Sequence, residues 1–114
     1  MSELLLVVLG AAVGAPLRYL VEHAAARRGG AFPAGTLLVN VAGSFVLGLV
    51  LAASPSVRLL VGTGFCGALT TYSGFALATE RLLSLRATAL AVANVVANVV
   101  VCVLAVWAAV AIAN

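Results

Sequence analysis

The polar residues inside the apolar part of this sequence are mostly amides and hydroxyls. Asn40 lies near the middle of one apolar run, with Thr36 and Ser44 four residues to either side. A later run carries a second set with the same spacing, namely Asn94, Asn98 and Cys102. Residues four apart share one face of a helix, so each set predicts a polar stripe. Asparagine in hydrocarbon is costly unless paired, which leaves two interpretations: hydrogen bonds between helices, or a polar track along which a small ion moves.

Ionisable groups suited to catalysis or proton coupling are scarce in the apolar runs. A proton-coupled transporter normally needs an embedded carboxylate, and an enzyme needs an acid–base pair or an activated nucleophile. The only histidine, His23, directly follows Glu22. The other two acids are Glu3 and Glu80. None of these acids is central in an apolar run. The sequence therefore predicts no enzyme, and it disfavours the alternative of a small four-helix drug–proton antiporter.

The composition predicts a membrane protein. The chain has 114 residues, of which 65% are hydrophobic and 8% charged, whereas soluble domains have about 45–50% apolar and about 25% charged residues. A spanning helix needs roughly 20 apolar residues, so the expected fold is an all-α integral membrane domain with four transmembrane helices. The six basic residues are single arginines and one pair, which indicates membrane-interface anchors and no nucleic-acid patch. We expect a multi-pass protein of the plasma membrane.

The apolar runs predict helices at about 4–20, 34–53, 57–83 and 87–113, with a loop over 24–33. The third run is unusual, since residues 62–75 contain four glycines and a cluster of hydroxyl residues, which are poor material for a continuous helix. We expect a break near 70–73, in the middle of the membrane. Interrupted backbone at that depth must be buried or line a cavity, and channels and transporters hold ions at such breaks.

Three stretches carry a resemblance to a known family. Residues 14–19 (GAPLRY), 35–45 (GTLLVNVAGSF) and 64–75 (GFCGALTTYSGF) are similar to the three signature stretches of the CrcB/Fluc fluoride channels, in the same order. The resemblance implies a passive fluoride-selective channel that exports fluoride and lowers its cytoplasmic concentration. It also implies an antiparallel, dual-topology dimer with a broken third helix and a structural sodium ion at the dimer centre.

The resemblance further implies roles for individual residues. The backbone carbonyls of Gly67 and Thr70 would hold the sodium ion. The fluoride pore would be formed by Asn40, Tyr72, Phe75, Thr71, Ser73, Asn98 and Arg18. Two positions depart from the family pattern: Tyr72 replaces the usual phenylalanine, and Gly74 replaces a hydroxyl residue. A non-conducting or obligate partner subunit of a heterodimeric channel is therefore the alternative.

The arginines are distributed unevenly between the two expected membrane faces. One face would hold only Arg58, and the other Arg18, Arg27, Arg28, Arg81 and Arg86. Positive loops favour the cytoplasmic side, which predicts both chain ends outside and one fixed orientation. The expected partner in the dimer is thus either a second copy or a paralogue inserted in the opposite orientation.

Overall fold

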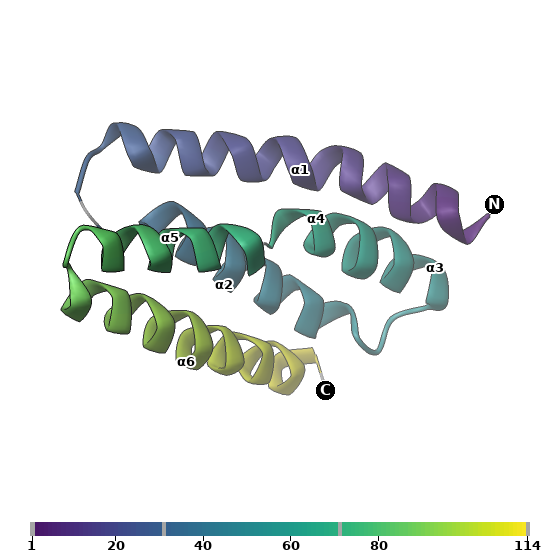
Figure 1. The fold of residues 1–114 in the computed structure, drawn as a ribbon. Coiled ribbons are helices and arrows are strands. Elements are labelled where there is room, and N and C mark those ends of the chain that lie inside the picture. Colours follow the sequence, from purple (N-terminus) through teal and green to yellow (C-terminus); the bar gives the residue numbers. More distant parts are fainter. Residues whose placement is uncertain (1, 31, 71, 114) are drawn as a thin grey trace.

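The computed structural model describes residues 2–30, 32–70 and 72–113, with the side chains of Tyr72 and Ser73 left undescribed. These residues form helices and turns, and no strand occurs among them. The elements are α1 (Glu3–Arg27), α2 (Ala34–Val50), α3 (Pro55–Val57), the π-helix η1 (Arg58–Cys66), α4 (Gly67–Leu69), α5 (Tyr72–Ser84) and α6 (Thr88–Ala113). Figure 1 shows α1 and α6 on opposite sides, with α3–α4 and α5 end to end between them. The fold is therefore four helical segments, the third of which is composite.

The first helix extends beyond its predicted end at residue 20. The expected loop over 24–33 was wrong for its first part, because α1 continues to Arg27. Ala24–Ala26 are the strongest helix formers available, and they outweigh the loop signal of the glycines that follow. Gly29 and Gly30 then adopt positive φ angles of 81° and 92° and end the helix. His23 accordingly lies within α1, stacked on Tyr19 with ring centroids 5.8 Å apart.

The other helix bounds differ from the predicted ones by a few residues. The second helix ends at Val50 instead of residue 53, because residues 51–53 already form a turn. The third segment begins at Pro55, where a proline at the first helical position favours initiation. It ends at Ser84, and α6 starts at Thr88 after a turn in which Arg86 has a φ of 59°.

The helical backbone of the third segment is interrupted after Leu69. Thr70 is extended, with φ −79° and ψ 156°, and helical structure resumes at Tyr72. The Thr70 hydroxyl and the Thr70 N–H both donate to the carbonyl of Cys66, each at 2.9 Å. Thr71, which falls in the predicted break, lies outside the described residues. The structure thus places a non-helical residue at the position where the sequence loses helix-forming residues.

Glycines allow α1 to approach the third segment very closely. A Cβ on Gly10 would collide with the carbonyl of Leu60 and the backbone nitrogen of Phe65. A Cβ on Gly14 would likewise collide with the Phe65 carbonyl. Gly10 and Gly14 form a GxxxG pair in the sequence, and α1 therefore meets the third segment with backbone against backbone at these two positions, as in membrane helix pairs.

Large apolar side chains cover the outside of the bundle. Leu4, Trp107 and Ile112 are 74%, 72% and 69% exposed, and they belong to the two helices at opposite sides of the fold. Helices α1 and α6 are long and apolar enough to cross a membrane, whereas α2 is apolar but has 17 residues. Such extensive apolar surface would be unfavourable in water. A surface of this kind is typical of a membrane protein.

Candidate ion pathway

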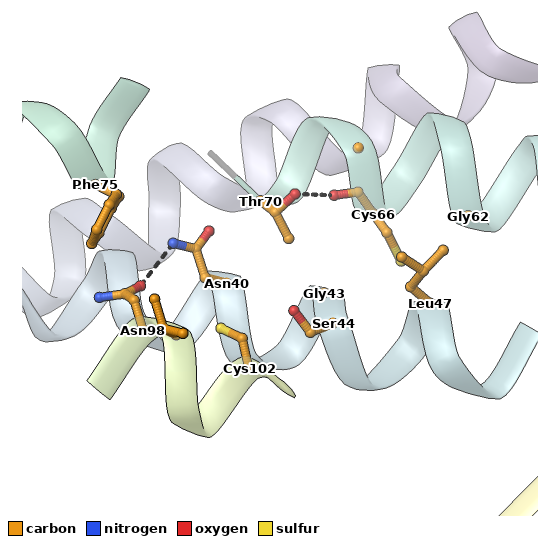
Figure 2. Close-up of a pocket in the computed structure, with 12 residues that line it drawn as sticks. Asn40, Gly43, Ser44, Leu47, Gly62, Cys66, Thr70, Phe75, Asn98 and Cys102 are labelled. Carbon is orange, nitrogen blue, oxygen red and sulfur yellow. Dashed lines mark hydrogen bonds between the residues drawn. The ribbon is translucent and has the colours of Figure 1, made fainter. Parts of the chain in front are cut away.

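A pocket of about 410 Å³ opens along one face of the chain, between α2, the third segment and α6. Figure 2 shows its lining, in which Asn40, Ser44 and Gly43 come from α2, and Asn98 and Cys102 from α6. The third segment contributes residues from both sides of the interruption, namely Gly62, Cys66, Gly67, Thr70 and Phe75. The interruption therefore borders the pocket, together with parts of both polar stripes.

Asparagine side chains join α2 to α6 beside this pocket. The Nδ2 of Asn40 donates to Oδ1 of Asn98 at 3.0 Å (Figure 2). The Nδ2 of Asn98 lies 2.8 Å from the backbone carbonyl of Asn94 and 2.9 Å from its Oδ1. Asn40, Asn98 and Asn94 are 9%, 6% and 0% exposed. Of the two interpretations of the stripes, interhelical hydrogen bonding is thereby confirmed for these amides, and the polar track stays a prediction.

The hydrogen-bond chain continues from α6 into α5. Asn94 Nδ2 donates to the hydroxyl of Thr79 at 2.9 Å, and that hydroxyl donates to the Phe75 carbonyl at 2.9 Å. Thr79 was not among the predicted site residues. Its position one turn after Phe75 was the only sequence signal, since a threonine commonly bonds the carbonyl four residues earlier. The chain of hydrogen bonds thus connects three helices and ends on the residue whose ring lines the pocket.

A second pocket, of about 360 Å³, lies at the end of the bundle where α1 meets the turn into α2. It is lined by Thr36 of the first polar stripe, by Gly74 and Arg81 of α5, and by Glu22. Oε1 of Glu22 is buried and has no hydrogen-bond partner among the described residues. Thr36 and Asn40, one turn apart on α2, therefore border two different hollows.

Residues 5–110 match the protein family described as CrcB-like protein, Camphor Resistance (CrcB). The chain belongs to the CrcB family. This match covers nearly the whole sequence and agrees with the resemblance carried by the three signature stretches.

Curated CrcB relatives are similar over most of their length. Fluoride-specific ion channel FluC 1 of Nocardia farcinica is 50% identical over 112 residues, which cover 96% of this chain and 79% of the relative. The protein of the same name from Streptomyces avermitilis is 50% identical and covers 83% and 82% of the two chains. Fluoride-specific ion channel FluC of Shewanella woodyi is 40% identical and covers 94% and 92%.

The residues expected from the CrcB pattern fall into three groups. Five of them line the open pocket: Asn40, Gly67, Thr70, Phe75 and Asn98. Arg18 is partly exposed on α1 and does not line either pocket. Thr71 and the side chains of Tyr72 and Ser73 lie outside the described residues. Within one chain, the structure therefore brings together the two amides and one of the aromatics predicted for the pore, and both predicted sodium ligands.

Proposed function

We propose that this CrcB protein is a passive, fluoride-selective channel of the plasma membrane that exports fluoride from the cytoplasm. The observation that carries the proposal is the meeting of buried amides and an aromatic ring at one open pocket, in a chain 50% identical to proteins named fluoride-specific ion channels. Neither feature alone specifies fluoride. Together they supply a family assignment and a set of side chains whose chemistry suits the anion.

The pocket offers the groups that can replace the water around a small anion. Asn40 and Asn98 place side-chain amides in its wall. Their N–H groups donate to Asn98 and Asn94 in this structure, and N–H groups of this kind can also donate to a small anion. Phe75 adds a ring whose edge carries partial positive charge. The described lining contains no acidic side chain that would repel an anion. Arg18, Tyr72, Thr71 and Ser73 complete the proposed pore residues.

Passive export follows from the acid–base chemistry of fluoride. Neutral HF crosses membranes, and it dissociates inside to fluoride, which is then retained by its charge. A fluoride-selective leak lets the anion leave under an inside-negative membrane potential. No coupling ion is required, in agreement with the positions of the three acids, none of which is central in an apolar run of the sequence. The biological outcome would be resistance to fluoride.

An open pocket on one face calls for a second subunit to close it. Gly67 is exposed there, and a Cβ added to it would meet nothing within 4 Å in the same chain. Packing within the chain therefore does not explain the glycine, whereas close approach of another chain would. We propose the antiparallel dimer, with the interruption of the third segment at mid-membrane depth and pores formed between the subunits.

The end of α4 fits a structural sodium ion at that interface. The last carbonyls of a helix lack donors within the helix, and the helix ends at Leu69, next to the open face. The residues proposed as ligands, Gly67 and Thr70, both line the pocket and offer hard carbonyl oxygens, which suit sodium. A sodium ion there would supply positive charge that holds the opposed helix ends together.

The direct test is fluoride efflux from liposomes that contain the purified protein alone. Valinomycin would set the membrane potential, and a selective electrode would follow fluoride release. We expect fast fluoride release with retained chloride. Release no faster than from protein-free liposomes, by protein shown to be folded and correctly reconstituted, would contradict a self-sufficient channel.

A second candidate is an obligate subunit of a heterodimeric channel. The ends of the helices favour it: Arg27 and Arg81 lie in the last turns of α1 and α5 at one end of the bundle, and Arg58 lies near the opposite end (Figure 1). Such a bias favours one orientation, so a paralogue would have to supply the other. Reporter fusions to the C-terminus decide between them, because a dual-topology homodimer should give equal signals from both sides of the membrane.

A further inference from the structure

The hydrogen bonds between α5, α6 and α2 form a chain with a defined direction. It starts at the Phe75 carbonyl, which can only accept a hydrogen bond. The Thr79 hydroxyl has one hydrogen, which it gives to that carbonyl at 2.9 Å, so towards Asn94 its oxygen must accept. Asn94 must therefore present Nδ2 to Thr79, at 2.9 Å, and Oδ1 in the other direction. The side chain of Thr79 thus determines which way the Asn94 amide faces.

The orientation of Asn94 is passed on to the amides that line the open pocket. Oδ1 of Asn94 accepts from Nδ2 of Asn98 at 2.9 Å, which leaves Oδ1 of Asn98 to accept from Asn40 at 3.0 Å. The backbone carbonyl of Asn94 also accepts from Asn98 Nδ2 and supports the same orientation. If the Asn94 amide were reversed, its NH₂ would face the NH₂ of Asn98. Two donors would then oppose each other where both residues are almost fully buried.

We infer that Thr79 is a positioning residue of the ion pathway: through Asn94 it fixes the orientation of the pore amides, and through the Phe75 carbonyl it ties them to the turn of α5 that carries the pore aromatic. This inference rests on the proposed fluoride-channel function. Thr79 does not line the open pocket, so it acts only through its neighbours.

A double-mutant cycle in fluoride efflux tests the inference. Thr79→Val keeps the shape of the side chain but removes both the donor to Phe75 and the acceptor for Asn94. Since Asn94 is 0% exposed, its amide would be left without that partner. We expect efflux about tenfold slower and a lower preference for fluoride over chloride, the usual size of effect for a buried polar group without its partner. Thr79→Ser, which keeps the hydroxyl, should restore wild-type behaviour.

The matched control is Thr63→Val, the same change at an exposed threonine of η1 that lies outside the open pocket. It should behave as wild type. The second arm of the cycle replaces Asn94 by Leu. If Thr79 acts through Asn94, then Thr79→Val should cause little further slowing in that background. A general loss of stability would instead multiply the two effects.

The outcomes separate the inference from the function on which it rests. Wild-type liposomes that release no fluoride would overturn the self-sufficient channel and the inference with it. Fluoride release by the wild type, with Thr79→Val equal to Thr63→Val, would overturn the inference alone. Multiplicative effects of Thr79→Val and Asn94→Leu would overturn it as well. If Thr79→Val yields no folded protein, Thr79→Ser and Thr79→Ala decide, since only the alanine variant should lose rate and selectivity.

Discussion

The two main helix interfaces of this protein differ in their polar groups, although α6 also packs closely on a glycine of α2, Gly48. Helix α1 meets the third segment through glycine, with backbone against backbone at Gly10 and Gly14. Helix α6 meets α2 and α5 through the amides and hydroxyl of a hydrogen-bond chain that includes Asn40, Asn98 and Thr79. The first interface is closed at these two glycines, and the second borders the open pocket. The side of the third segment that faces α1 therefore holds the segment in place. The side that faces the open pocket is available to an ion or a partner.

The largest expected effect comes from filling the glycine interface. Gly10→Val would drive a branched side chain into the backbone of Leu60 and Phe65, which cannot move aside as the end of a flexible side chain can. We expect a loss of at least about 3 kcal/mol in stability, and little folded protein. The measurement is the yield of monodisperse protein in detergent and its thermal unfolding midpoint. Ala12→Val, on the exposed face of α1, is the control and should be tolerated. Equal midpoints for the two variants would show that the close approach is not needed.

A substitution at the polar interface of α6 should instead slow fluoride transport. Asn98→Leu removes the acceptor for Asn40 and the donor to Asn94 while keeping a similar volume. Two buried groups lose a partner, each worth at least about 1 kcal/mol, so we expect fluoride efflux to fall by about thirtyfold or more. Val96→Leu, at an exposed position two residues from Asn94 and Asn98 and so on the opposite face of α6, should conduct normally. Full efflux by Asn98→Leu would remove this amide from the pathway and leave it as interhelical support.

The sequence predicted the residues of the polar interface better than their partners. Spacing of four placed Asn94 and Asn98 on one face, and the cost of an unpaired amide predicted that they would be buried and bonded. Thr79 escaped prediction because it stands beside Glu80 and Arg81 at the end of an apolar run, where a polar residue needs no explanation. Its partner Asn94 lies 15 residues away on another helix. Only the packing of α5 on α6 brings them together.

The end of α1 and the π-helix depend on both local helix propensity and contacts between helices. The extension of α1 to Arg27 resulted from helix propensity prevailing over a loop signal, and both signals were visible in the sequence. The π-helix over Arg58–Cys66 had no such signal. It contains Gly62 and Gly64, and a Cβ on Gly64 would approach the Val7 carbonyl to 2.6 Å. Its wider backbone spiral is thus in direct contact with α1, and such contacts cannot be read from periodicity.

Gly67, on the open side of the third segment, contrasts with the glycines that face α1. Gly67→Ala adds a Cβ where the chain itself offers no contact within 4 Å, in contrast to Gly10. The folded subunit should therefore be unaffected, whereas a closely packed partner would have to move. We expect a weaker dimer and fluoride efflux about fivefold slower. This change corresponds to a free-energy cost of about 1 kcal/mol. Light scattering after size-exclusion chromatography and the efflux assay measure the two effects. Wild-type assembly and efflux would argue against a subunit interface at this position.

The smallest expected effect marks where the polar interface ends. Cys102 completes the predicted stripe with Asn94 and Asn98 and lines the pocket, but it has no part in the hydrogen-bond chain from Asn40 to Phe75. Its thiol is at best a weak donor, so it contributes little to holding a hydrated anion. We expect Cys102→Val, which removes the thiol and keeps an apolar side chain of similar size, to change efflux by no more than about twofold. Cys102→Ser, with a stronger donor at the same place, separates polarity from packing. A tenfold loss with valine that serine restores would extend the pathway by one turn of α6, and it would mean that the ion uses polar groups outside the amide chain.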